Sequence, residues 1–345
     1  MFDRRSALLG LGALAGAATL PTRAAVPAKP VRKPPRLRAG DVVGLIEPAG
    51  FTADSFSLEE IVAGIRAMGL VPKVAPHVME RSGYLAGSDA DRAADVNAMF
   101  ADKDVRAIFA IRGGWGCARI LPLLDFDMIR ANPKLLTGFS DITALHMAIA
   151  AKAGFPTIHG PNASSSWGKF SWEAFRAVAF DGATPTFTNP TAVEDRLVPR
   201  VGSIRTIGKG KAQGPLYGGN LTVLTALVGT PYLPSFDGAI LFLEDTNEAE
   251  YRIDRMLTQL SLAGILKRVS GVVFGQCTDC FARDVSYGGF TLSEVLVHHL
   301  KPLGVPVFQG AQFGHVANQF SLPQGVRAEM DADAGTIRML EAAVS

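Results

Sequence analysis

The stretch LLTGFSDITALHMAIAA, residues 135–151, passes from a short apolar run through a sharp turn into a helical pattern. The leading leucines predict the end of a strand, and Ile142, Leu145 and Ile149 recur at the spacing of one buried helix face. A strand that leads directly into a helix is the repeating unit of a parallel α/β sheet.

The same alternation extends along most of the chain. Apolar runs that end in glycine, serine or acidic residues alternate with helical patterns, as in VVGLIEPAG (42–50), SLEEIVAGIRAMGL (57–70) and VRAIFAIRGGWG (105–116). A second series contains GAILFLEDTN (238–247) and VSGVVFGQ (269–276), with a helix expected from about Glu248 to Ala263 and another around LSEVLVHHL. Functional groups in such sheets gather at the carboxyl ends of the strands.

These patterns predict two α/β domains with an active site in the cleft between them. The first is a flavodoxin- or Rossmann-like parallel-sheet domain over residues 41–165, and the second is a smaller α/β domain over 208–345. Residues 166–207 contain several prolines and little periodicity, which indicates a connection between the domains.

The N-terminus has the pattern of an export signal. Arg4 and Arg5 precede an apolar run from Ala7 to Leu20, and small residues follow, so residues 1–24 are expected to be a cleaved signal peptide. The run is shorter than the roughly 20 residues that cross a bilayer as a helix, so stable membrane insertion is not expected. The paired arginines favour the twin-arginine route and a periplasmic location.

Composition narrows the classes of partner. The formal net charge is +2, and removal of residues 1–24 would bring it to zero, so binding of nucleic acid is not expected. Residues 25–40 hold four prolines and several basic residues, which is typical of an extended linker. No metal or other cofactor is expected, because the CTDC pair at Cys277 and Cys280 lacks the further ligands that a metal site needs. That pair could instead form a small disulfide or take part in redox exchange.

Ser140 lies at the turn between the predicted strand and helix. Unpaired amides and the positive end of the helix dipole would surround it there, and both suit an oxyanion. The corner is similar to a nucleophile elbow, except that Ile142 occupies the position of the second glycine. A helix-capping serine is the competing interpretation.

A nucleophilic serine needs a base and an acid. Among the histidines, His315 and His159 follow predicted strands, and both are candidates for the base. Glu244 follows a buried strand and is the first candidate for the acid, with Asp245 as its rival. Cys117 is a weaker candidate for the nucleophile, because no histidine or acid is near it in the sequence.

Several short motifs occur in an order that resembles the L,D-carboxypeptidase family of serine peptidases, which includes murein tetrapeptide carboxypeptidases and microcin C self-immunity peptidases. The motifs are RGGWG (112–116), GFSDIT (138–143), HGP (159–161), GGNLTVL (218–224), LFLED (241–245), YRIDRML (251–257) and FGH (313–315). Each motif is weak alone, but seven in the correct order are specific.

The resemblance implies that Ser140 is the nucleophile and that Glu244 and His315 complete the charge relay. It also implies an oxyanion hole from the backbone amides of Gly114 and Asp141. Arg112 is the nearest candidate to bind the terminal carboxylate of a substrate, with a structural ion pair as the alternative. A homodimer is compatible with the resemblance, although nothing in the composition indicates one.

The expected substrate is a peptidoglycan stem peptide or muropeptide, from which the enzyme would release the terminal D-Ala. Two alternatives remain open. One is a hydrolase of peptidyl-adenylate antibiotics, and the other is a periplasmic protein that binds a ligand in its cleft without catalysis.

Overall fold

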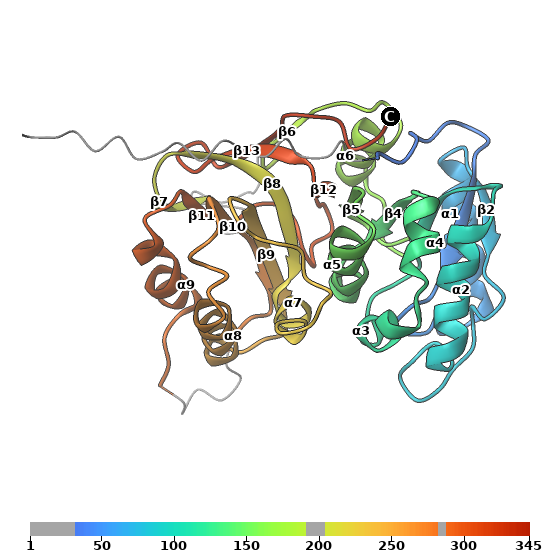
Figure 1. Cartoon of the computed structure of the whole chain (residues 1–345), viewed down its shortest axis with the longest axis horizontal. Coiled ribbons are helices and arrows are strands. Elements are labelled where there is room, and N and C mark those ends of the chain that lie inside the picture. The colour runs from blue at the N-terminus through green and yellow to red at the C-terminus, as the bar shows by residue number, and fades with distance from the viewer. Residues whose placement is uncertain (1–31, 191–203, 282–287) are drawn as a thin grey trace, which may run out of the picture. The chain divides into compact units, whose positions relative to one another are not determined.

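The computed structural model describes residues 32–190, 204–281 and 288–345. The predicted signal peptide, residues 1–24, lies outside the described residues, so export stays a prediction. Helices flank two β-sheets in the described part of the chain (Figure 1), which confirms the predicted α/β class.

The first sheet has the strand order β12-β5-β4-β3-β1-β2, and Figure 1 labels β12, β5, β4 and β2. Strands β1 to β5 are parallel, and their order 2-1-3-4-5 is that of flavodoxin-like sheets, as predicted. Strand β12 comes from the C-terminal part of the chain and pairs antiparallel with β5. The strands are β1 Val42–Ile46, β2 Val71–Val74, β3 Val105–Ala110, β4 Leu135–Gly138, β5 Thr157–His159 and β12 Leu322–Gln324.

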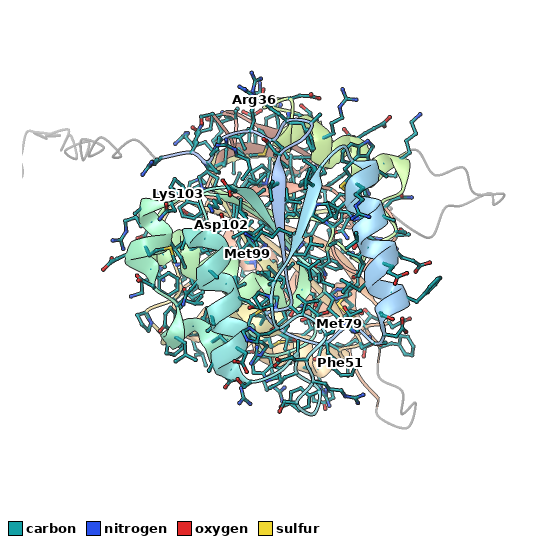
Figure 2. All side chains as sticks on the ribbon, turned by 90° about the vertical axis from the view of Figure 1, so that its right-hand side faces the viewer. Arg36, Phe51, Met79, Met99, Asp102 and Lys103 are labelled. Carbon is teal, nitrogen blue, oxygen red and sulfur yellow. A yellow bond between two sulfur atoms is a disulfide. The ribbon has the colours of Figure 1, made fainter. Side chains whose placement is uncertain are left out.

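Helices cover this sheet on both faces, and α1 and α2 lie on either side of it in Figure 2. Polar side chains cap their first turns: Asp54 accepts from the amide of Ser57 at the start of α1, and Ser88 does the same for Asp91 in α2. The helices are α1 Ser55–Ala67, α2 Asp89–Ala101, α3 Cys117–Ile120, α4 Phe126–Ala131, α5 Thr143–Lys152 and α6 Lys169–Ala179.

The second sheet has the order β6-β14-β13-β8-β9-β10-β11-β7. Its centre, β8 to β11, is parallel, and antiparallel strands extend it at both edges. The strands are β6 Thr186–Phe187, β7 Arg205–Gly208, β8 Lys211–Asn220, β9 Ile240–Thr246, β10 Gly271–Thr278, β11 Val307–Gln309, β13 Arg327–Asp331 and β14 Thr336–Met339. The helices α7 Leu221–Ala226, α8 Glu250–Leu262 and α9 Leu292–Leu300 accompany it.

Three features differ from the expectations. The second sheet has more strands than the first, because short antiparallel strands from the chain's connecting and C-terminal segments join it. The segment expected to be an irregular connection contains α6, whose Phe175 is fully buried. The described part of the expected linker packs against the body: Leu37 is buried, and its amide donates to the carbonyl of Ala179.

Helix α5 lies between the two sheets (Figure 1). Every residue from Thr143 to Ile149 is buried, so the helix has no solvent-facing stripe over these two turns. The single buried face expected from the sequence is therefore an underestimate, because α5 packs against β5 on one side and against β8 and α7 on the other. The corner at Ser140 is thereby held between the two sheets.

The carboxyl ends of the five parallel strands, β1 to β5, point to one edge of the first sheet. Phe51 and Met79, which follow β1 and β2, lie at the lower end of the sheet in Figure 2, whereas Asp102, which precedes β3, lies toward the upper end. The buried carboxylate of Glu47 braces this lower edge, because it accepts from the hydroxyl of Thr52 and from the amide of Met79 (3.2 Å).

Candidate active site

Ser140 adopts a backbone conformation that is unusual for a residue with a side chain. It follows β4 and begins a 3₁₀ turn, Ser140–Ile142, that leads into α5, and its φ is +65°. Such a conformation costs on the order of 1–3 kcal/mol and is concentrated at functional sites. The amide of Phe139 before it is fixed by Oδ1 of Asn162 at 3.1 Å. The chain therefore presents Ser140 on a sharp elbow rather than as an ordinary helix cap.

The structure brings together the three side chains that the sequence selected. Nε2 of His315 lies 3.0 Å from Oγ of Ser140, and Nδ1 of His315 lies 2.8 Å from Oε2 of Glu244. Because a carboxylate can only accept, Nδ1 donates to Glu244 and Nε2 is left to accept the hydroxyl proton of Ser140. This arrangement can remove the proton from a serine as the serine attacks a carbonyl.

Glu244 lies near the end of β9 and is fully buried. Its second oxygen, Oε1, has no hydrogen-bond partner within the described residues. Gly314 closes over the carboxylate, since a Cβ at this position would lie 2.8 Å from Oε2 and the backbone φ is +106°. Only glycine fits there, which explains the residue before His315.

Two opposing effects act on the pKa of His315. Burial of the ring lowers this pKa, whereas the hydrogen bond and charge of Glu244, together with the charge of Asp245, raise it. The second effect is larger, and the pKa lies above the ordinary value of 6.5. The ring of Phe139 packs edge-on against the imidazole with centroids 4.9 Å apart.

Asp245, the rival of Glu244, faces another set of partners. Its carboxylate accepts from the side chain of Asn220 (3.0 Å) and from the amide of Thr222 (3.0 Å), and it does not contact His315. The backbone amide of Asn220 in turn donates to the hydroxyl of Thr143 at the start of α5 (2.9 Å). This chain of bonds ties the serine's helix to the strand that carries Glu244.

His159, the rival of His315, is fully buried and both ring nitrogens lack a partner among the described residues. Aromatic rings surround it, with that of Phe242 at 5.2 Å. Burial lowers its pKa well below the ordinary value, so the ring is neutral at physiological pH. It forms no hydrogen bond to Ser140.

The glycine-rich loop after β3 lies directly against the elbow. A Cβ on Gly113 would lie 2.8 Å from Cβ of Ser140 and 3.4 Å from the amide nitrogen of Asp141. The carbonyl of Gly113 accepts from the amide of Gly50 (3.2 Å), and the described residues provide no acceptor for the amide of Gly114. The amides of Gly114 and Asp141 thus belong to segments in contact beside the hydroxyl, as an oxyanion hole requires.

Asp141 is fully buried and is not among the residues that line the pocket beside Ser140. It accepts from the amide of Cys117 at 2.7 Å. Burial raises the pKa of Asp141 to about 6, against the lowering effects of Cys117 and Arg92. The Cys117 thiol is buried as well, and burial followed by the charge of Asp141 raises its pKa. Because the thiol is neutral and inaccessible, Cys117 does not qualify as the nucleophile, the role for which it was the weaker candidate beside Ser140.

Arg112 extends along the pocket wall, and its Nη1 donates to the carbonyl of Phe51 at 2.8 Å. It forms no ion pair in the described part of the chain, so the structural ion pair considered from the sequence is absent there. The guanidinium is exposed at the cavity that contains Ser140.

This cavity has a volume of about 740 Å³. Its walls come from one face of α1, from the loops after β1, β3 and β4, and from the segment after β5. Among the described residues that line it, His315 alone comes from the C-terminal half of the chain. The lining residues are Thr52, Ala53, Ser57, Glu60, Ile61, Gly64, Arg112, Gly113, Gly114, Phe139, Ser140, Asn162, Ala163, Ser164, Ser165, Ser166, Trp167 and His315.

Sequence reasoning missed the residues that hold the site together. Asn162 stands two residues after the glycine of HGP, and Thr143 and Asn220 lie within other quoted motifs, yet none of them was given a role. The signal that could have indicated them is an Asn or Thr at a strand end, shortly after a strand or at a helix start, as at Asn220, Asn162 and Thr143.

The described residues contain neither a candidate metal site nor a candidate membrane span. No cluster of three or more His, Cys, Asp or Glu side chains in this part of the chain could hold a metal ion. Within the same residues, every helix is too short or too polar to span a membrane.

Comparisons with known proteins match both halves of the chain. Residues 43–160 match the LD-carboxypeptidase N-terminal domain, and residues 213–330 match the LD-carboxypeptidase C-terminal domain. The "probable murein peptide carboxypeptidase" of Bacillus subtilis is 36% identical, over 91% of this chain and 95% of its own. The murein tetrapeptide carboxypeptidase of Pseudomonas aeruginosa is 30% identical, over 84% of this chain and 93% of its own.

The microcin C7 self-immunity protein MccF of Escherichia coli is also similar, with 30% identity over 75% of this chain and 80% of its own. A solved structure of MccF in complex with glutamyl sulfamoyl guanosine aligns with a TM-score of 0.81 and 26% identity. That alignment covers 91% of this chain and 99% of the solved chain.

Proposed function

Since the chain belongs to the LD-carboxypeptidase family, we propose that it is a serine-type carboxypeptidase that cleaves the L,D peptide bond of peptidoglycan stem tetrapeptides and releases the terminal D-Ala. The observation that carries the proposal is the pair of hydrogen bonds that joins Ser140 to His315 and His315 to Glu244. Relatives named for murein peptides and murein tetrapeptides support the choice of substrate.

In the first half of the reaction, Ser140 attacks the carbonyl carbon of the scissile bond. Nε2 of His315 takes the hydroxyl proton, and Glu244 stabilises the imidazolium that forms. The amides of Gly114 and Asp141 receive the charge that develops on the carbonyl oxygen; loss of one such donor costs about 3–4 kcal/mol. His315 then gives the proton to the leaving D-Ala amine, and an ester of Ser140 remains.

In the second half, water replaces the departed D-Ala. His315 removes a proton from the water, which attacks the ester carbonyl in the same oxyanion hole. The proton returns to Oγ of Ser140 as the C–O bond breaks, and the shortened peptide leaves with a new carboxylate. The cavity has room for a peptide chain end, and Arg112 is the cation in it that would bind the substrate's terminal carboxylate.

The decisive experiment measures release of D-Ala from a disaccharide tetrapeptide by the purified protein and by Ser140→Ala. We expect the variant to lose activity by at least about a thousandfold, because the covalent route depends on this oxygen. Ser55→Ala, a change at an exposed serine outside the cavity, is the matched control. Equal activity of the wild type and Ser140→Ala would remove both the nucleophile and the proposed mechanism.

A second substrate class is supported by the similarity to MccF, whose structure was solved with a glutamyl sulfamoyl guanosine. A peptidyl-adenylate has an acyl group that the same serine could attack. Parallel assays with a tetrapeptide and a peptidyl sulfamoyl nucleoside, following D-Ala and nucleoside release, separate the two substrates. A protein that binds either compound without turnover would instead fit a non-catalytic binding role.

We further propose that the protein acts in the periplasm after export through the twin-arginine route, where stem peptides ending in D-Ala occur. The basis is the sequence of residues 1–24 alone. Cell fractionation with an antibody should find a shortened protein in the periplasm, and Arg4→Lys/Arg5→Lys should retain the precursor inside. Full-length protein confined to the cytoplasm would contradict the location while leaving the chemistry intact.

A further inference from the structure

The loop that carries His315 is fastened to the end of one neighbouring strand. This loop lies outside the helices and strands, between β11 and β12. Gln276 lies near the end of β10. Its side chain donates to the carbonyl of Gly310 (2.7 Å), and its backbone amide donates to the carbonyl of Phe313 (3.0 Å). Thr278, the last residue of β10, donates its hydroxyl to the carbonyl of His315 itself (2.7 Å). Hydrogen bonds from β10 thus hold the backbone of the loop at His315.

Thr278 is also joined to the strand that carries Glu244. Its carbonyl accepts from the amide of Asn247 (2.9 Å) and from the hydroxyl of Thr246 (3.1 Å), both at the end of β9. One residue therefore bonds to both segments that must be in register for the contact between Glu244 and His315. A shift of Thr278 would move the base relative to the acid.

A disulfide fixes the turn in which Thr278 lies. Cys277 and Cys280 are bonded, with their Cα atoms 5.4 Å apart, so the crosslink closes directly around Thr278 and Asp279. Asp279 has a φ of +55°, a conformation that a residue with a side chain rarely adopts without support. The crosslink supplies such support.

A role in redox exchange is less well supported than a structural role. Exchange-active thiols commonly have a low pKa from a helix N-terminus. Cys277 instead lies in the last residues of β10, where its backbone pairs with Asp245 of β9, and not at the N-terminus of a helix.

We propose that the Cys277–Cys280 disulfide and Thr278 form a positioning element for His315, so that full activity requires the closed disulfide. The inference rests on the proposed serine-peptidase function and adds a dependence on redox state. Reduction by a dithiol breaks the one S–S bond, adds two electrons and two protons to give two thiols, and oxidises the dithiol to its cyclic disulfide. The turn then loses its crosslink, and the hydrogen bond from Thr278 to His315 is no longer held in place.

The test combines Thr278→Val with reduction, because the two changes should act through the same contact. Thr278→Val keeps the branched shape but removes the donor to His315. We expect kcat to fall about tenfold or more with KM nearly unchanged, because small displacements of a catalytic group cost up to about a hundredfold. Dithiothreitol should lower kcat of the wild type similarly, and it should have little further effect on Thr278→Val. Thr278→Ser, which keeps the hydroxyl, should restore most of the activity.

Controls separate positioning from loss of folding. The chain has three cysteines. Thiol titration of the denatured protein should therefore find one free thiol before reduction, that of Cys117, and three after reduction. Thr258→Val, at an exposed threonine of α8, is the matched change without a bond to His315. If dithiothreitol leaves the disulfide closed, Cys277→Ser/Cys280→Ser takes its place. Full kcat in the thiol-titrated reduced protein, or in Thr278→Val, would overturn the inference, as would a loss explained entirely by a lower Tm.

A substrate-independent readout keeps this inference separate from the proposed function. A fluorophosphonate reagent labels a serine that a histidine activates, whatever peptide the enzyme cleaves. Labelling of Ser140 should slow by a similar factor on reduction and in Thr278→Val. If no tetrapeptide is cleaved but labelling of Ser140 still slows on reduction, the substrate proposal fails and the positioning inference stands. Equal labelling rates in the oxidised and reduced protein would refute the positioning inference alone.

Discussion

The amide of Cys117 donates to Oδ2 of Asp141 at 2.7 Å, and this bond joins the glycine-rich loop to the residue that follows the serine. The two predicted oxyanion donors, the amides of Gly114 and Asp141, come from these two segments. The buried carboxylate therefore fixes the spacing between donors that are far apart in the sequence. Arg92 extends the same contact, because it is buried and donates to the carbonyl of Gly116 at 3.0 Å.

Asp141→Asn should reduce the pH dependence of stability. The pKa of Asp141 is about 6 in the folded protein and its ordinary value is 3.8, so between these pH values this carboxyl is ionised in the unfolded chain but still protonated in the folded one. The contribution of this carboxyl to the free energy of unfolding is fully present below pH 4 and is lost as the pH rises to about 6. The loss is about 3 kcal/mol, because the pKa differs by about two units between the folded and unfolded states. Asn does not titrate, so urea unfolding from pH 4 to 7 should show a smaller decline.

Two comparisons make that result specific. Asp245 has a pKa raised to about 6 by burial and by the charge of Glu244, so Asp141→Asn should leave a residual decline. Asp141→Ala removes the acceptor of the Cys117 amide, so it should be less stable than Asp141→Asn by about 1–3 kcal/mol at every pH, because neither variant titrates at this position. An unchanged pH profile for Asp141→Asn would mean that the carboxylate is not the group that titrates.

The pH profile of kcat/KM should report the protonation of His315. Only the neutral ring can accept the proton of Ser140, so activity should fall as the pH drops through the His315 pKa, which lies above 6.5. Glu244→Gln removes the charge that raises this pKa, so the acidic limb should move to lower pH. The maximal rate should also fall by at least about a hundredfold, because the amide no longer stabilises the imidazolium. Asp127→Asn, at an exposed carboxylate, should leave the limb unmoved.

Gly314→Ala should separate steric contact from backbone strain. The added Cβ would lie 2.8 Å from Oε2 of Glu244, at a residue whose φ is +106°. We expect kcat to fall about a hundredfold while KM changes little, because Glu244 and His315 lose their alignment. Gly229→Ala also has a positive φ, +88°, but no atom within 4 Å of the new Cβ. An equal loss of kcat in both variants would attribute the effect to strain rather than to the contact.

The sequence predicted the local elements of the fold because each carries its own signal. The apolar runs and turn residues of the first sheet have the expected spacing, and the LSEVLVHHL segment forms α9 over the predicted residues. Ser140 could be placed at a corner for the same reason, since a strand end and a helix start meet there. Its partners were selected through the ordered motifs, because residue spacing alone left His159 and Asp245 as rivals.

Other features depend on contacts that local sequence does not encode. Helix α6 lies in a proline-bordered segment, and its burial of Phe175 depends on neighbours from elsewhere in the chain. Strand β12 has three residues and is defined by its pairing with β5. The role of Thr278 is likewise set by a bond to a residue 37 positions away. Such features follow from tertiary packing rather than from periodicity.

Arg112→Met should weaken binding of substrates that end in a free carboxylate. The guanidinium faces the cavity without an ion-pair partner among the described residues, so a substrate carboxylate could take that place. We expect KM for the tetrapeptide to rise about 10- to 100-fold, and we expect little change for the same peptide with a C-terminal amide. Arg106→Met, at an exposed arginine of β3 outside the cavity, is the matched control. If Arg112→Met lowered kcat equally for the acid and the amide, the side chain would act by holding the carbonyl of Phe51 instead of by binding the carboxylate.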